Sequence, residues 1–165
     1  MDRLWAPWRM EYLKNIDCQG PGCIFCLLPE EKKDKKNLII DRGEKCFVIM
    51  NLYPYNNGHL MVVPYKHTSD CSDLGDDVIV EMWKLVNKCK SVLRKAFRPE
   101  GFNIGMNIGR TAGAGIDQHI HMHIVPRWNG DTNFMPLIGE TKVISQSLPE
   151  SYDTLKPYFE QMGSN

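Results

Sequence analysis

Hydrophobic positions along the chain follow two different spacings, and each spacing predicts a different kind of element. Between Asp73 and Phe97, apolar residues recur every three or four positions, which is typical of an amphipathic helix. These residues are Ile79, Met82, Trp83, Val86, Cys89, Leu93, Ala96 and Phe97. The runs CFVIMN and HLMVVP, separated by turn-forming Pro, Asn and Gly, instead predict two strands of a hairpin with a wide loop.

Two further strands are predicted after the helix. FNIGMNI and the stretch that ends at Pro126 flank a glycine-rich connection, GRTAGAGID. Residues 1–45 predict no long element, and the tail after Trp128 predicts only a short helix near Tyr152 to Met162. A chain of 165 residues is long enough for one core and too short for two. We therefore expect an α+β domain with a mainly antiparallel sheet and one long amphipathic helix.

Charge is concentrated in the segment PEEKKDKKN, residues 29–37. Such a run is most often a solvated loop, and we interpret it as one, without a binding role. Over the whole chain, 20 Lys and Arg balance 20 Asp and Glu, so no net field attracts nucleic acid or an anionic membrane. We expect neither partner, and any anion binding must be local.

The beginning of the chain and its cysteines bear on location. MDRLWAPWRMEYLK is interrupted by charges, and no apolar run approaches the roughly 18 residues of a membrane span. These patterns predict a cytoplasmic protein. In a reducing compartment the six cysteines are better interpreted as thiols than as disulfides, and CIFC at 23–26 indicates metal or redox chemistry.

Three of the five histidines alternate with apolar residues in HIHMH, residues 119–123. On a strand, positions i, i+2 and i+4 project to one face, so His119, His121 and His123 are expected to share a surface. Three interpretations stay open on this pattern alone. The histidines line a polar face, they ligate a catalytic metal, or one of them is a nucleophile that attacks phosphorus with two helpers beside it.

The glycine-rich segment GRTAGAGID precedes these histidines. Its small residues let backbone N–H groups approach an anion closely, and Arg110 could add charge, which suits a phosphate site. A tight turn between strands explains the same composition equally well. Arg127, after the histidines, is expected to pair with a local carboxylate rather than to act in catalysis.

Several motifs together carry a resemblance to a known family. HIHMHIV resembles the signature of the histidine triad (HIT) nucleotide-binding superfamily, and IMNLYPYNNGHLMVVPYKH resembles its strand, turn, Gly-His and second strand. CIFC resembles its zinc-containing members, while LWAPWRMEYL and PRWNGDTNFMP resemble the branch related to diadenosine tetraphosphate phosphorylases and Fhit-type hydrolases. The resemblance implies a single HIT-like domain over residues 1–165, with a core at about 23–128 and an extension at each end.

Catalytic roles follow from the resemblance by matching positions. His121 matches the nucleophile, which takes the nucleotidyl group on Nε2 while a backbone carbonyl holds the hydrogen on Nδ1. His123 matches the residue that contacts the phosphate and leaving-group oxygens. His59 matches a supporting histidine beneath the triad, and Asn107 matches a side-chain amide at the phosphate site.

Substrate contacts are implied in the same way. Asn51 matches the residue that grips the ribose hydroxyls, and Ile24 and Phe25 match apolar walls of the base pocket. Gly115 and Ile116 stand where hydrolase and phosphoramidase members carry Gln followed by Ser or Thr, and small residues there leave room for a phosphate ion. Some phosphorylases have a Gly-Ser pair near this point, where this chain has AGAG, so the acceptor stays open.

Taken alone, the C-x-x-C pair leaves its chemistry undecided. Zinc needs two more ligands, a deaminase needs an H-x-E that no histidine here begins, and a thioredoxin-like pair would lie in a βαβ pattern that is not visible. The resemblance implies that the ligands are two cysteines, a histidine eight residues after the Gly-His, and the first triad histidine. It therefore implies a structural zinc held by Cys23, Cys26, His67 and His119.

The implied reaction is nucleotidyl transfer from a dinucleoside polyphosphate through a nucleotidyl-histidine. Inorganic phosphate as the acceptor gives a phosphorylase of diadenosine tetraphosphate, and water gives a hydrolase. The alternatives are an adenosine phosphoramidase and, from another class, a zinc-containing module that only binds or senses nucleotide. A magnesium ion could accompany the polyphosphate, although no carboxylate cluster is visible to hold it. The resemblance also implies a homodimer joined along sheet and helix.

Overall fold

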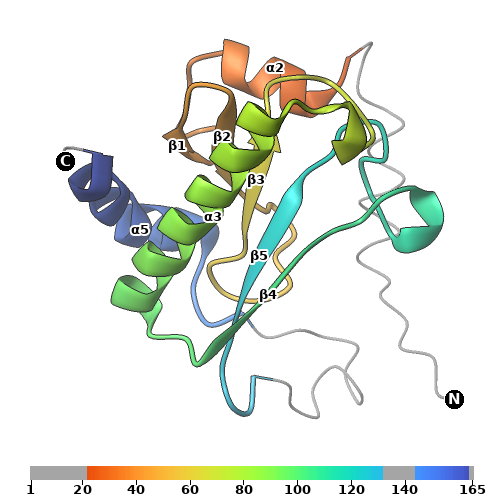
Figure 1. The fold of residues 1–165 in the computed structure, drawn as a ribbon. Helices are drawn as coiled ribbons and strands as arrows, with labels where there is room; N and C mark the ends of the chain where they lie inside the picture. The colour runs from red at the N-terminus through yellow and green to blue at the C-terminus, as the bar shows by residue number, and fades with distance from the viewer. Residues whose placement is uncertain (1–21, 132–143, 164–165) are drawn as a thin grey trace, which may run out of the picture.

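Five strands form one antiparallel sheet in the computed structural model, which describes residues 22–131 and 144–163 (Figure 1). The strand order is β1-β2-β3-β5-β4, so β5, the strand that contains His123, lies between two other strands. The strands are β1 (Ile39–Arg42), β2 (Cys46–Met50), β3 (Leu60–Pro64), β4 (Gly101–Met106) and β5 (Met122–Arg127). The predicted hairpin is β2 and β3, and the mainly antiparallel sheet is confirmed.

Side chains alternate between the two faces of this sheet, and each face has its own cluster of buried residues. On β2, Val48 and Met50 belong to the larger cluster, while Phe47 and Ile49 belong to the smaller one. Every residue of β2 and β3 is buried, because both faces of these strands are covered. The same alternation on the histidine stretch sends Ile120, Met122 and Ile124 into the larger core.

The predicted amphipathic helix is α3 (Asp76–Phe97), which lies across the face of the sheet that carries the larger cluster (Figure 1). Acidic residues stand in its first turn and basic residues in its last, which suits the helix dipole. Its buried residues are Met82, Leu85, Val86, Cys89, Val92 and Leu93. The prediction was wrong for Trp83, which is 49% exposed because it follows Met82 by about 100° around the helix and leaves the buried face.

Elements also form where the sequence predicted none. Helix α2 (Ile24–Glu30) and strand β1 lie within residues 1–45, and both are too short to give a clear periodic pattern. Helix α5 (Leu148–Gly163) begins four residues before the short helix that we predicted. It packs on α3 and β1, where Tyr152 donates a hydrogen bond from its hydroxyl to the carbonyl of Ile39 at 3.0 Å. Two short 3-10 helices, η1 (Cys71–Asp73) and η2 (Arg110–Ala112), complete the described elements.

The histidine stretch differs from the expected continuous strand. Strand β5 begins at Met122, so His123 lies within it, while His119 and His121 precede it. The backbone N–H of Ile120 donates instead to the carbonyl of Thr68 at 2.7 Å, which ties this segment to the chain that follows β3. The side chains still alternate, because the chain remains extended enough to bury Ile120 on the opposite side from the two later histidines.

Among the described residues, no helix is both long enough and apolar enough to cross a membrane. Trp5, Trp8 and the last five residues of PRWNGDTNFMP lie outside the described residues.

Candidate active site and metal centre

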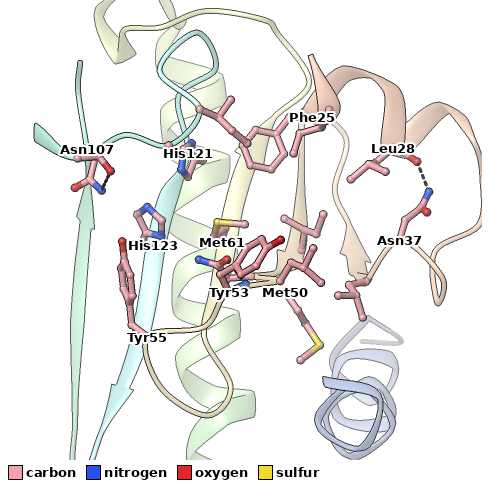
Figure 2. A pocket seen from close by; sticks show the side chains of 18 of the residues that line it. Phe25, Leu28, Asn37, Met50, Tyr53, Tyr55, Met61, Asn107, His121 and His123 are labelled. Carbon is pink, nitrogen blue, oxygen red and sulfur yellow. Dashed lines mark hydrogen bonds between the residues drawn. The ribbon is translucent and has the colours of Figure 1, made fainter. Parts of the chain in front are cut away.

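A cavity of about 250 Å³ lies on the side of the sheet that carries the smaller cluster. Its walls come from α2, the loop after β2 and the glycine-rich loop before β5. Figure 2 shows His121, His123 and Asn107 at one end of this cavity, and Leu28 and Asn37 at the other. Small-molecule sites usually measure roughly 300–1,000 Å³, so this cavity suits one nucleoside-sized group rather than two.

His121 is held in one tautomer by the backbone. Its Nδ1 lies 2.8 Å from the carbonyl oxygen of His119, and since a carbonyl can only accept, Nδ1 carries the hydrogen. The expected contact with a backbone carbonyl is therefore present, and Nε2 keeps its lone pair. The ring is 5% exposed and lies 5.0 Å from the ring of Phe25. Burial lowers the pKa of His121 below the ordinary histidine value, although the hydrogen bond to His119 opposes this shift.

The tautomer of His123 is set through His59. The backbone N–H of Tyr55 donates to Nδ1 of His59 at 3.0 Å, so in a neutral His59 the hydrogen sits on Nε2. That Nε2 lies 2.9 Å from Nδ1 of His123 and donates to it. A neutral His123 consequently carries its own hydrogen on Nε2, as a donor. A glycine is required just before His59, because Gly58 has φ of +71° and a Cβ there would lie 3.0 Å from Leu93 and Phe97.

The two amides predicted from the sequence, Asn51 and Asn107, both line the same cavity. Asn51 accepts a hydrogen bond at Oδ1 from the backbone N–H of Tyr53 at 2.9 Å, which turns its Nδ2 toward Nδ1 of His59 at 3.3 Å. Asn107 follows β4, and its Nδ2 donates to the carbonyl of Gly113 at 3.4 Å. Asn107 thereby connects the end of β4 to the glycine-rich loop beside the triad.

The glycine-rich loop reaches the cavity through its small residues. Gly113 and Gly115 line the cavity beside His121, and Gly113 has φ of +91°, which few other residues adopt. Arg110 does not line it, since its side chain is 81% exposed and pairs with Asp117 at 3.1 Å. The structure therefore brings the small residues to the site and leaves the arginine outside it.

The walls of the cavity include predicted and unpredicted residues. Ile24 and Phe25 line it as expected, and Phe25 is 2% exposed. Leu28 stands one turn later on α2, and recognising that helix would have predicted it. Sequence reasoning missed Leu28, Lys36, Asn37, Leu38, Ile49, Met50, Leu52, Tyr53, Tyr55 and Met61.

Two of these lining residues correct our interpretation of the charged segment. Lys36 and Asn37 close the run that we expected to be a solvated loop, yet both line the cavity. The run folds back because Arg42 of β1 pairs with Asp34 at 2.7 Å and donates to the carbonyl of Pro29 at 2.9 Å. Arg127 pairs with Asp131 at 2.7 Å, in agreement with the prediction of a local carboxylate partner.

A second cluster brings together the four residues expected to bind zinc. One ligand atom from each of Cys23, Cys26, His67 and His119 lies within 4.8 Å of all the others. Nδ1 of His119 is 3.2 Å from Sγ of Cys23, 3.6 Å from Sγ of Cys26 and 3.2 Å from Nδ1 of His67. Nδ1 of His67 is 3.4 Å from Sγ of Cys26. These four residues could hold a metal ion.

The donor set and its distances fit tetrahedral zinc. Zn–S bonds of about 2.3 Å and Zn–N bonds of about 2.0–2.1 Å separate neighbouring ligand atoms by roughly 3.3–3.8 Å. The tautomer of His119 also fits, since its Nε2 donates to the carbonyl of Pro64 at 2.8 Å and leaves Nδ1 bare toward the cysteines. The three triad histidines do not share one ion site, because Nε2 of His119 donates to the carbonyl of Pro64 and its Nδ1 faces Cys23 and Cys26. This geometry disfavours a three-histidine metal site.

Comparisons with known proteins give the following matches. The HIT domain family model matches residues 31–130. An AP-4-A phosphorylase of Mycobacterium tuberculosis is 40% identical over 158 residues, which cover 92% of this chain and 80% of that protein. An adenosine 5′-monophosphoramidase of Schizosaccharomyces pombe is 31% identical over 108 residues, which cover 66% of this chain and 76% of that protein. A Zn-bound histidine triad family protein from Mycobacterium smegmatis is similar in structure, with a TM-score of 0.69, 26% identity, and coverage of 87% of this chain and 96% of that one.

Proposed function

The chain belongs to the HIT domain family, and from this premise we propose that it cleaves dinucleoside polyphosphates by nucleotidyl transfer to His121. The observation that carries the proposal is the fixed tautomer of His121, which leaves Nε2 as an unprotonated nucleophile in a cavity that it lines. The names of two relatives support the class of reaction, since one is an AP-4-A phosphorylase and the other an adenosine 5′-monophosphoramidase.

In the proposed reaction, the lone pair on Nε2 of His121 attacks the α-phosphorus. A P–N bond forms, the bond from that phosphorus to the bridging oxygen breaks, and the nucleoside polyphosphate leaves with the bond electrons on its oxygen. Nε2–H of His123 stabilises the charge that develops on the phosphate oxygens, because the relay from Tyr55 through His59 gives it a hydrogen there. An acceptor oxygen then attacks the same phosphorus and releases His121.

The remaining residues of the cavity have binding roles in this proposal. Asn107 contacts the phosphate, and Asn51 the ribose hydroxyls. Ile24 and Phe25 form apolar walls for the base, supported by their place in the lining of the cavity. Gly115 leaves room for the acceptor, since a glycine in the lining takes up no side-chain volume beside His121.

Inorganic phosphate is the acceptor that we propose, which makes the protein a phosphorylase. The name of the Mycobacterium tuberculosis relative, an AP-4-A phosphorylase at 40% identity, supports this choice. Hydrolysis by water and cleavage of adenosine phosphoramidates are the alternatives, the second favoured by the Schizosaccharomyces pombe relative. A module that only binds nucleotide would have no physical need for the tautomer that exposes Nε2 of His121.

One experiment tests the covalent step. The protein is incubated with diadenosine tetraphosphate and quenched in alkali, where phosphoramidates survive, and peptides are analysed by mass spectrometry. We expect an adenylyl group on the peptide that contains His121, no adduct after an acid quench, and loss of turnover in His121→Ala. With phosphate present, we expect ADP and ATP as products, whereas hydrolysis would give AMP and ATP. Turnover by His121→Ala without any adduct in the wild type would overturn the mechanism.

We also propose that Cys23, Cys26, His67 and His119 hold a structural zinc, supported by their distances and by the Zn-bound structural relative. When bound, the ion would fasten α2 to the sheet. The described residues that line the cavity include no carboxylate, so nothing there supports the magnesium ion considered from the sequence. A cytoplasmic location stays a prediction, as does a single domain over residues 1–165 with a core at about 23–128.

A homodimer is the assembly that we propose. The outer edge of β4 pairs with no described strand, so its backbone groups are available for a partner. On α3, Val80 and Trp83 are 51% and 49% exposed and lie one turn apart. An open strand edge together with exposed apolar residues on a helix supports association along sheet and helix.

A further inference from the structure

The end of the cavity away from the triad carries one firmly oriented polar side chain, that of Asn37. Figure 2 shows Asn37 beside Leu28, on the far side of the cavity from His121 and His123. Its Nδ2 donates to the carbonyl of Leu28 at 3.0 Å and to Oε2 of Glu31 at 3.1 Å. Both partners can only accept, so the two amide hydrogens are used and the amide has one possible orientation.

The carbonyl oxygen of this amide is what Asn37 offers to a ligand. Among residues 22–131 and 144–163, no hydrogen bond to Oδ1 of Asn37 is present. An amide whose nitrogen is anchored and whose oxygen is open presents a fixed acceptor. A fixed acceptor at the edge of an apolar cavity selects ligands that bring a donor to the same place.

The backbone around Asn37 is also held in place. The N–H of Asn37 donates to the carbonyl of Lys33 at 2.9 Å, and the carbonyl of Leu38 accepts from Met50 at 2.9 Å. Leu38 has φ of +58°, a left-handed conformation that is strained for leucine. Such strain persists only where surrounding contacts impose it, so the position of Asn37 does not adjust freely to a ligand.

We propose that Oδ1 of Asn37 accepts a hydrogen bond from the exocyclic amino group of the nucleobase, and so selects amino bases such as adenine over keto bases. The inference rests on the proposed function, because transfer at His121 places the phosphate at one end of the cavity and the base at the other. An amino group donates to Oδ1. A keto oxygen in the same place would face another oxygen and lose its hydrogen bond to water.

Lys36 is the other polar residue at this end, and its ammonium would favour the opposite choice. An ammonium group only donates hydrogen bonds, so Lys36 would favour a base with a keto oxygen, which accepts them. Lys36 is exposed, whereas Asn37 is half-buried and anchored through its side chain. A flexible, hydrated lysine loses rotamer freedom and hydration when it binds, while the anchored amide loses little. The geometry therefore favours Asn37 as the residue that determines specificity.

Calorimetric binding of three nucleoside monophosphates tests the inference without requiring turnover. AMP carries an amino group at position 6 of the purine, IMP carries an oxygen there, and purine riboside monophosphate carries neither. We expect the affinity to decrease from AMP to purine riboside monophosphate to IMP, with AMP bound about 10-fold more tightly than IMP. In Asn37→Ala, AMP should weaken until its affinity lies within about 2-fold of that of IMP.

Two control variants accompany this measurement. Lys36→Ala should keep the wild-type order, and Glu31→Gln should keep it as well, because the Gln carbonyl can still accept from Nδ2 of Asn37. The affinity for IMP reports whether Asn37→Ala remains folded, since IMP gains nothing from Asn37. Equal or reversed wild-type affinities would overturn the inference even if that variant does not fold.

The possible outcomes separate this inference from the proposed function. Equal affinities for AMP and IMP, or tighter binding of IMP, would overturn the role of Asn37. If the adenylyl adduct on His121 forms in the same preparation, the proposed function survives that result. If no monophosphate binds and no adduct forms, both are wrong.

Discussion

A backbone N–H decides which nitrogen of His123 carries a hydrogen. Tyr55 donates to Nδ1 of His59, and Nε2 of His59 donates to Nδ1 of His123. The resemblance in NNGHL predicted His59, and the alternation in HIHMH predicted that His121 and His123 share a surface. The contribution of Tyr55 could not be predicted, because a main-chain N–H is common to almost every residue and leaves no mark in the sequence.

The relay gives a prediction for His59 as a positioning residue. In His59→Ala, His123 can shift its hydrogen to Nδ1 and lose the donor at Nε2, so we expect kcat to fall about 10- to 100-fold with a smaller change in KM. His59→Gln should recover part of this loss, because its amide can donate to Nδ1 of His123. Steady-state kinetics on both variants are the measurement. A rise in KM at constant kcat would instead mean that His59 serves only binding.

At the scale of elements, a helix or strand could be predicted from the sequence only where its buried residues recur with a regular spacing over several residues. The hairpin of β2 and β3 and the helix α3 were predicted because each buries a regular face over several residues. Helix α2 has seven residues and includes Pro29, so no pattern marks it, yet it provides Ile24, Phe25 and Leu28 to the cavity. Its position depends on contacts distant in sequence, between Cys23 and Cys26 on one side and His67 and His119 on the other.

Removing the metal should therefore loosen α2. We expect about one zinc per chain in the purified protein, and a fall in Tm of roughly 10 °C in Cys26→Ser or after chelation, since each kcal/mol lost shifts Tm by about 2–4 °C at this size. Nucleotide affinity should fall at the same time, because α2 forms one wall of the cavity. Zinc analysis, thermal melts and calorimetry measure these effects.

Cys71→Ser is the matched control for that experiment. Cys71 is a free, partly buried cysteine in η1, outside the four-residue cluster. It should leave zinc content and Tm close to those of the wild type. Metal-free protein with an unchanged Tm would contradict a structural role for the ion.

At the scale of the whole molecule, the two faces of the sheet have different tasks. One face packs on α3 and α5 to form the main core, and the other carries α2 and the cavity. The fold class was predictable from the patterns of the longer elements. The extent of α5 was not, because residues 148–163 contain two prolines and their buried residues are few. Packing against α3 and β1 stabilises that helix and determines its extent.

The proposed homodimer gives a prediction for the mass of the protein in solution. Light scattering during size exclusion should give about twice the chain mass of 19.0 kDa. Trp83→Lys should shift the mass toward that of one chain, because a charge would then enter an apolar contact. Lys84→Ala, at the neighbouring exposed position, is the control and should leave the mass unchanged. A wild-type mass of one chain at micromolar concentration would contradict the dimer.

His119 serves two neighbours with different parts of the same residue. Its imidazole faces the cysteines, while its carbonyl oxygen holds Nδ1 of His121. If the four-residue cluster holds zinc as proposed, a sample that is only partly loaded with zinc is a mixture of molecules that can and cannot adenylylate His121. The amount of adenylylated protein formed in the first turnover would then be proportional to the zinc content of the sample and not to the protein concentration. Specific activities of different preparations would agree only when they are expressed per zinc ion.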